Sequence, residues 1–147
     1  MAETGHGEVS KSYITLDSSL ESVDQAEEIV LKTARELGFQ EDDEGSIGMA
    51  VREGVVNAVV HGNRYSSKKR IHLGIEATPS QLVITIGDEG EGFDLSSLPD
   101  PLAAENLMRQ SGRGIMLIRA FMDEFDLHPR HGGGTEIRIA KNLAGRS

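Results

Sequence analysis

The sequence predicts a two-layer α+β sandwich, an α/β protein in which helices cover one face of a mixed, largely antiparallel sheet. Two observations support this class. Apolar residues recur at helical spacing in two stretches between residues 18 and 62. Further along, residues 71–77, 82–86 and 135–139 alternate between apolar and polar side chains. Such alternation is typical of strands that face helices on one side only.

The composition is that of one ordinary globular domain. The chain has 147 residues, of which 37% are hydrophobic and 27% charged, so we expect a single domain over residues 1–147. It has no cysteine, which excludes disulfides and thiolate metal sites. The N-terminal segment lacks the apolar core of a signal peptide and no run reaches membrane-spanning length, so we expect a cytoplasmic location. The net charge of −9 argues against direct nucleic-acid binding.

The first elements follow from local signals. Residues 1–11 are polar and predict a flexible tail, and residues 12–16 predict a short strand. Ser18 and Glu21 have the Ser-x-x-Glu spacing of a capping box, which predicts that a helix begins there. Gly38 predicts its end after about five turns. The apolar residues at helical spacing are Leu20, Val23, Ala26, Val30, Ala34 and Leu37.

A second helix carries the first candidate functional residues. We interpret the acidic residues 40–45 as a link into this helix, which is expected to end near His61 and Gly62. Glu53 and Asn57 lie four residues apart and therefore on one helical face. Because their neighbours are mostly valine, this polar pair needs a partner, and a bound ion or ligand would provide one. The alternative is a solvated pair at the rim of the helix.

A predicted hairpin leads into a glycine-rich segment. The alternating residues 71–77 and 82–86 are separated by Thr78-Pro79-Ser80. The second strand runs directly into Gly87-Asp88-Glu89-Gly90-Glu91-Gly92-Phe93, where glycines allow a sharp turn and close approach of a ligand. Residues 94–111 contain at most a short helix, and a long irregular segment in a small domain is usually a lid or binding loop.

The last part of the chain predicts one helix and one strand. Gly112-Arg113-Gly114 opens the helix, and Gly132-Gly133-Gly134 introduces the strand at residues 135–139. The expected order is strand, helix, helix, two strands, lid, helix, strand, with a crossover through the third helix. The apolar stripe of that helix is expected to comprise Ile115, Ile118, Phe121, Met122 and Phe125.

The polar residues together suggest a nucleotide site. Asp88 at a strand end offers an acceptor for an exocyclic amine, and nearby glycines leave room for a flat heterocycle. The helix start at Gly112 offers free N–H groups to phosphate oxygens. Asn57 could give Mg²⁺ an oxygen, and Glu53 would point at the group that attacks the terminal phosphate. The chain lacks the P-loop pattern and the Rossmann glycine spacing.

Four motifs then carry a family resemblance. The chain has E-x-x-x-N-A-x-x-H-G at Glu53 to Gly62, D-x-G-x-G-F at Asp88 to Phe93, G-R-G at 112–114 and G-T at 134–135. In this order they resemble the boxes of the gyrase, histidine-kinase and MutL-type ATPase superfamily, which has the Bergerat-type ATP-binding fold. From about residue 12 to residue 140, the chain is most similar to the anti-sigma factor serine kinases.

The resemblance implies roles for these residues. Asp88 would read the adenine amine, Asn57 would bind Mg²⁺, and Glu53 would be the general base. The residues implied in shaping the ATP pocket and its lid are Gly90, Gly92, Gly112, Arg113 and Gly114, with Thr135 supporting the adenine end. The implied activity is that of a serine/threonine kinase and anti-sigma factor, a homodimer that phosphorylates a small antagonist protein and sequesters a sigma factor.

Two alternatives stay open. The protein could be a partner-switching module that uses ATP only to order its lid and grip a partner. It could also be the detached catalytic domain of a sensor histidine kinase, although 147 residues leave no space for a helix pair with the acceptor histidine. Gly54 stands where alanine is common in the family, and the lid does not identify a partner.

Overall fold

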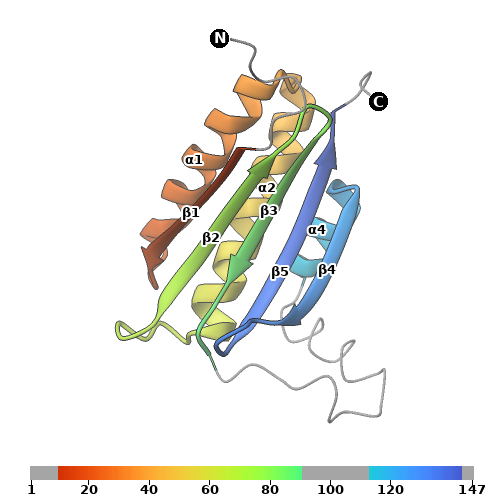
Figure 1. Cartoon of the computed structure of the whole chain (residues 1–147). Helices are drawn as coiled ribbons and strands as arrows, with labels where there is room; N and C mark the ends of the chain where they lie inside the picture. Colours follow the sequence, from red (N-terminus) through yellow and green to blue (C-terminus); the bar gives the residue numbers. More distant parts are fainter. Residues whose placement is uncertain (1–9, 91–112, 144–147) are drawn as a thin grey trace.

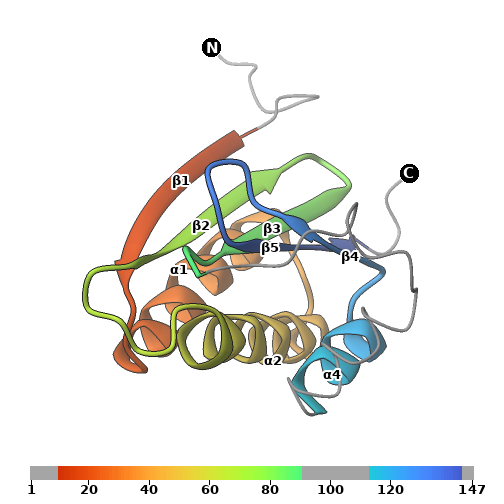
Figure 2. The same ribbon diagram turned by 90° about the horizontal axis from the view of Figure 1, so that it is seen from below.

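The computed structural model describes residues 10–90 and 113–143, and every structural statement below concerns these residues. They form β1 (Ser10–Asp17), α1 (Glu21–Leu37), α2 (Glu41–Asn57), a π-helical turn (Ala58–Gly62), β2 (Arg70–Ala77), β3 (Gln81–Gly87), α4 (Arg113–Phe121), β4 (Glu124–Pro129) and β5 (Thr135–Asn142). The strands form one sheet in the order β1-β2-β3-β5-β4. The three helices lie against one face of this sheet and leave the other face open (Figures 1 and 2).

The predicted two-layer fold is confirmed. Every pair of neighbouring strands is antiparallel, so the sheet is not mixed. β3 and β4 both pair with β5, which lies between them, and α4 connects them along the chain. The expected crossover through the third helix is therefore present.

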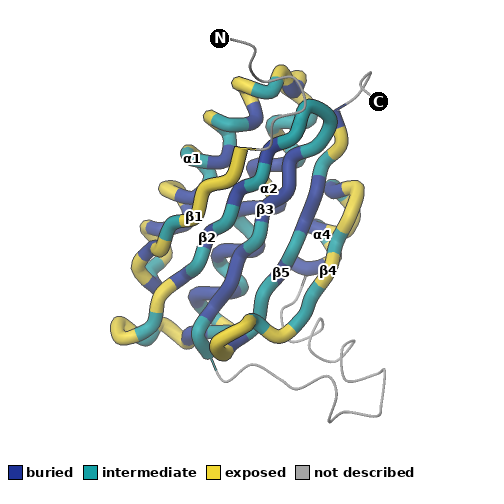
Figure 3. Tube along the Cα trace, in the orientation of Figure 1, coloured by how far each residue is buried: buried dark blue, intermediate teal, exposed yellow. Residues whose placement is uncertain are grey.

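The core lies between the helices and the sheet (Figure 3). On α2, Ile47, Val51 and Val55 are fully buried, as are Ile84 and Ile86 across the sheet layer. β2 and β3 pair as the predicted hairpin. Alternation in β2 gives one face to the core and the other to the open side of the sheet, as its pattern predicted.

The start of α1 differs from the prediction. Its N-cap is Leu20, and no side chain caps the helix, so the predicted capping box between Ser18 and Glu21 is wrong. The hydroxyl of Ser22 instead donates a hydrogen bond to the main-chain oxygen of Asp17 at 2.5 Å. The Ser22 hydroxyl therefore stabilises the turn between β1 and α1 and does not cap the helix. The predicted end is confirmed, because Gly38 caps α1 in the left-handed conformation with φ of 96°.

α2 begins earlier than predicted. The acidic residues that we interpreted as a link, Glu41, Asp42, Asp43 and Glu44, form its first turn. Carboxylates are favourable at this end of a helix because they interact with the positive end of its dipole. On the side facing α1, Arg52 forms ion pairs with Asp24 at 2.7 Å and Glu27 at 2.8 Å.

β4 was not predicted. The apolar spacing predicted that Phe125 lies on the third helix, but this is wrong, because α4 ends at Phe121 and Phe125 pairs with Ile139 of β5. The predicted tail at residues 1–11 also overlaps β1, because the strand includes Ser10 and Lys11. The predicted lid at residues 94–111 and residues 1–9 lie outside the described residues. No described helix is long and apolar enough to cross a membrane.

Candidate functional site

Three segments that are distant in the sequence meet at one end of the sheet. They are the end of α2 with the π-helical turn, the end of β3, and the turn between β4 and β5, at the lower end of the molecule in Figure 1. The crossover topology brings them together, since β5 lies beside β3. This end contains Glu53, Asn57 and Asp88, the residues singled out by the sequence.

Asp88 lies at the centre of this group and is only 4% exposed. Its Oδ1 accepts hydrogen bonds from the backbone N–H groups of Gly90 at 2.9 Å and Thr135 at 3.1 Å. Its own N–H donates to the oxygen of Thr135 at 2.9 Å. Within residues 10–90 and 113–143, no group donates a hydrogen bond to Oδ2. The carboxylate is therefore held by one oxygen and keeps acceptor capacity on the other.

Burial raises the pKa of Asp88 above the ordinary value for an aspartate. The backbone hydrogen bonds from Gly90 and Thr135 and the positive charge of Arg130 oppose this rise without cancelling it. A desolvated acceptor of this kind favours a ligand that donates a hydrogen bond, because an unpaired buried charge is costly.

Glycines surround this carboxylate where side chains would displace it. A Cβ at Gly62 would lie 2.1 Å from Oδ2 of Asp88, and one at Gly134 would lie 2.0 Å from its main-chain oxygen. A Cβ at Gly90 would lie 2.1 Å from the oxygen of Gly62. Gly134 also has a φ of 93°, which favours glycine. The three backbone segments can approach Asp88 this closely only because the residues at Gly62, Gly90 and Gly134 have no side chain.

Asn57, the last residue of α2, has a buried amide oxygen without a partner. Its Oδ1 makes no hydrogen bond in the described part of the chain. Buried polar atoms are nearly always paired, so this oxygen has acceptor capacity that no described residue uses. The π-helical turn follows immediately and is closed by a hydrogen bond of 2.8 Å from the N–H of Asn63 to the oxygen of Ala58. π-helical turns are frequent at functional sites.

Glu53 lies one helical turn before Asn57 and against the start of α4. A Cβ at Gly114 would lie 2.9 Å from its Oε1, so the missing side chain leaves room for the carboxylate. Glu53 forms no hydrogen bond or ion pair with any residue that the structure describes. Arg113 begins α4.

Some of the remaining predicted site residues lie in the described part of the chain and others do not. Gly90 and Thr135 adjoin Asp88, and Gly114 adjoins Glu53, as given above. Gly92 and Gly112 lie outside the described residues, as does the side chain of Arg113. Thr135 contributes through its backbone, which hydrogen-bonds to Asp88 in both directions.

Two further residues contact the Asp88 segment, although the sequence did not predict them as site residues. Asn63 is 1% exposed, and its Oδ1 accepts a hydrogen bond from the N–H of Glu89 at 2.7 Å. Arg130 donates from Nε to the main-chain oxygen of Asp88 at 2.8 Å. Asn63 could have been identified in the sequence, because it is a polar residue directly after Gly62 at the end of the first motif. No sequence signal identifies Arg130, because its contact depends on the unpredicted strand β4.

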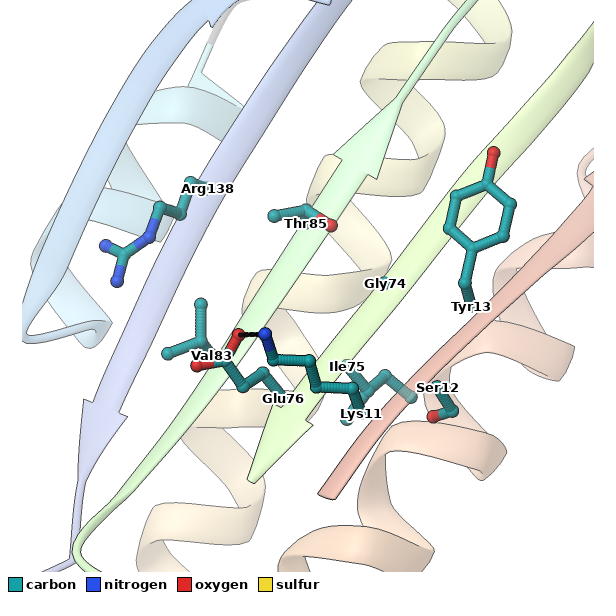
Figure 4. A pocket seen from close by; sticks show the side chains of 9 residues that line it. All are labelled: Lys11, Ser12, Tyr13, Gly74, Ile75, Glu76, Val83, Thr85 and Arg138. Carbon is teal, nitrogen blue, oxygen red and sulfur yellow. Dashed lines mark ion pairs between the residues drawn. The ribbon is translucent and has the colours of Figure 1, made fainter. Parts of the chain in front are cut away.

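A hollow of about 350 Å³ on the open face is separate from this group (Figure 4). Its lining residues come from β1, β2, β3 and β5 and include Tyr13, Thr85 and Arg138. An ion pair between Lys11 and Glu76, at 3.9 Å, lies at one side of it. None of Glu53, Asn57 and Asp88 lines this hollow.

The antiparallel sandwich has a buried carboxylate directly after β3 and, on α2, a buried amide oxygen that has no partner among the described residues. The chain matches the family described as histidine kinase-like ATPase domain over residues 16–141, and it belongs to that family.

Named relatives narrow the comparison. The anti-sigma F factor of Bacillus subtilis (strain 168) is 30% identical over 105 residues, covering 70% of this chain and 72% of that protein. The serine-protein kinase RsbW of Oceanobacillus iheyensis is 28% identical over 117 residues, covering 76% of this chain and 73% of that protein.

A solved structure supports the same fold. The crystal structure of the RsbU and RsbW domains of Rv1364c from Mycobacterium tuberculosis has a TM-score of 0.64 and 21% identity. The match covers 91% of this chain and 32% of that longer chain. The likeness therefore supports the architecture described above.

Proposed function

We propose that this protein is an ATP-dependent serine/threonine kinase that acts as an anti-sigma regulatory factor. The observation that carries the proposal is the buried Asp88 carboxylate, whose Oδ2 accepts from no described residue and suits the amine of adenine. The names of its relatives, an anti-sigma F factor and a serine-protein kinase, support the activity. Gly90 and Thr135 hold the carboxylate, and Arg113 and Gly114 at the start of α4 would bind the phosphates.

Glu53 would act as the general base. Its carboxylate would accept the proton of a serine or threonine hydroxyl on the substrate protein as that oxygen attacks the γ-phosphorus of ATP. A new bond forms between the hydroxyl oxygen and phosphorus, the bond to the β-phosphate oxygen breaks, and ADP leaves. The lack of a hydrogen bond or ion pair from Glu53 to any described residue supports this role.

Asn57 would hold Mg²⁺ through its unpartnered amide oxygen. Mg²⁺ prefers oxygen ligands and commonly takes few from the protein beside phosphates and waters, which suits a single amide. The ion would neutralise charge on the phosphates. If so, Asn57→Ala should lower ATP affinity mainly when Mg²⁺ is present, as measured by calorimetry with the metal and with excess chelator. An equal loss under both conditions would make Asn57 a packing residue.

The proposed partners are a sigma factor and a small antagonist protein, with the kinase acting as a homodimer in the cytoplasm. The name of the anti-sigma F factor supports a sigma factor as partner. No direct contact with nucleic acid or membrane is part of this function.

Transfer of labelled phosphate tests the proposal. Purified protein is incubated with γ-labelled ATP and the antagonist from its own cell, and we expect label on a serine or threonine of the antagonist. Binding of ATP without labelling of the antagonist would favour the partner-switching module without kinase activity. Label on a histidine would instead favour the sensor histidine kinase domain.

A further inference from the structure

The peptide group that follows Asp88 is held at both of its polar ends by side chains. Its carbonyl oxygen, on Asp88, accepts a hydrogen bond from Nε of Arg130 at 2.8 Å. Its N–H, on Glu89, donates to Oδ1 of Asn63 at 2.7 Å. Neither bond belongs to the regular pairing of the sheet, which ends at Gly87. Two side chains thus fix the plane of one peptide.

Asn63 is anchored to the helical side and to the start of β2. It is 1% exposed, and its Nδ2 donates to the main-chain oxygen of Arg70 at 3.0 Å. Its own N–H closes the π-helical turn on Ala58. With both its amide oxygen and its amide nitrogen engaged, the side chain has a single orientation toward Glu89.

Arg130 reaches the same peptide from the turn between β4 and β5. A Cβ at Gly87 would lie 2.7 Å from Cδ of Arg130, so its aliphatic part passes directly over this glycine. The N–H of Arg130 donates to the oxygen of Gly134 at 2.9 Å, which fixes the turn. The same turn leads to Thr135, whose N–H donates to Oδ1 of Asp88.

The orientation of this peptide governs the carboxylate. Rotation of the plane changes ψ of Asp88 and φ of Glu89 together, because the peptide group is rigid. A change in ψ of Asp88 alone would displace the chain that follows, including the N–H of Gly90, and without that hydrogen bond the carboxylate could turn about its own side-chain torsions. A hydrogen-bond acceptor discriminates between ligands only when it is held in the productive geometry.

We propose that Asn63 and Arg130 are positioning residues that set the base specificity of the nucleotide site. They hold the Asp88–Glu89 peptide so that the carboxylate accepts from an exocyclic amine and rejects a carbonyl oxygen in the same place. This inference rests on the proposed function, because it requires that Asp88 reads adenine. Asn63 comes from the helical layer and Arg130 from the sheet layer, and neither needs to contact the nucleotide to have this role.

The ratio of ATP affinity to inosine triphosphate affinity tests this role. Inosine carries a carbonyl where adenosine carries the amine, so the ratio reports on the carboxylate, whereas general damage weakens both nucleotides equally. The variants are Arg130→Met, which keeps the aliphatic packing on Gly87, Arg130→Lys, which restores a donor, and Asn63→Ala. Arg138→Met is the matched control, because Arg138 pairs with Glu124 at 2.9 Å on the same face and does not contact Asp88.

We expect Arg130→Met and Asn63→Ala each to lower the ratio about fivefold or more, the effect of one ordinary hydrogen bond. Arg130→Lys should recover most of the ratio, and Arg138→Met should leave it unchanged. The double variant should lose less than the product of the single losses, because both substitutions free the same peptide. Thermal unfolding identifies the folded variants, and if Asn63→Ala does not fold, Arg130→Met decides.

A wild-type ratio in folded Arg130→Met, or equal weakening of both nucleotides, would overturn the positioning role while leaving the proposed function intact. If the wild-type protein itself binds both nucleotides equally, the reading of adenine by Asp88 is wrong, and this inference fails with it. The wild-type measurement thus distinguishes the two failures.

Discussion

At Asp88, burial and hydrogen bonding act on one carboxylate in opposite directions. Burial raises its pKa, whereas backbone N–H groups from Gly90 and Thr135 lower it, and the balance remains on the raised side. Ionised Asp88 therefore costs the nucleotide-free protein stability at neutral pH, and a donor from a ligand offsets this cost. The residue is expected to contribute more to binding than to folding.

Asp88→Asn separates these two contributions. The amide oxygen can still accept from Gly90 and Thr135, and the buried charge is removed, so we expect the thermal midpoint without nucleotide to be unchanged or higher. ATP binding should fall by roughly fivefold to more than a hundredfold, about 1 to 3 kcal/mol, because the amide presents a donor to the adenine amine. Calorimetry and thermal unfolding measure the two effects. Unchanged affinity in the folded variant would rule out adenine reading.

The raised pKa of Asp88 also makes ATP binding depend on pH. The amine donates to the ionised carboxylate, so affinity should fall as the pH decreases through this raised pKa, at a higher pH than for an ordinary aspartate. The effects of pH on ATP itself and on its metal complex are the same for wild type and Asp88→Asn, so the variant is the control for them. Parallel pH profiles of affinity in the two proteins would contradict the assignment.

Helices and strands were predicted correctly where a regular apolar spacing extended over many residues. They were predicted wrongly where one segment carried the signals of two kinds of structure. The spacing in α1 and the alternation in β2 and β3 predicted these elements correctly. The acidic run at residues 41–44 resembled a link because its side chains are polar, yet four carboxylates stabilise the first turn of α2.

β4 was missed because its signal is short and ambiguous. Only Phe125 and Leu127 alternate with polar residues there, and Phe125 also continues the helical spacing of Phe121 and Met122. What forms the strand is its pairing with β5, which is a long-range contact that local spacing cannot reveal. Missing β4 also hid the contact of Arg130, whereas motif spacing was enough to make Glu53, Asn57 and Asp88 candidates, which the structure brings to one end of the sheet.

The hairpin of β4 and β5 should show a dependence of stability on pH. Burial alone lowers the pKa of His128, but hydrogen bonds to Glu136 at 2.8 Å and Asp126 at 2.6 Å outweigh it, so the pKa is raised overall. The folded protein therefore holds this proton more tightly than the unfolded chain. The resulting stabilisation is complete below the unfolded pKa and is lost as the pH rises through the folded one.

We expect His128→Gln to lower the free energy of unfolding at about pH 6 and to have less effect at about pH 8.5. The difference should stay under about 1 kcal/mol, because the His128 side chain is 34% exposed and surface pairs are weak. Urea unfolding of both proteins at the two pH values measures it. A deficit that grows with increasing pH would contradict the assignment.

In the whole molecule, the candidate site residues gather at one end of the two-layer sandwich. Glu53 and Asn57 lie on α2, and Asp88 directly follows β3. Thr135, the first residue of β5, and Arg130, in the turn before it, both hydrogen-bond to Asp88. The order β1-β2-β3-β5-β4 makes this possible, because it places the start of β5 beside the end of β3. The family match over residues 16–141 spans all of these segments.

Glu53→Gln tests whether this end of the molecule transfers a phosphoryl group with Glu53 as its general base. The substitution keeps the size of the side chain but removes its basic carboxylate, so Mg·ATP affinity should stay within a few fold. Phosphorylation of the antagonist should fall on the order of a hundredfold or more, the usual scale of a general base. A variant that binds ATP normally and phosphorylates at the wild-type rate would contradict the account.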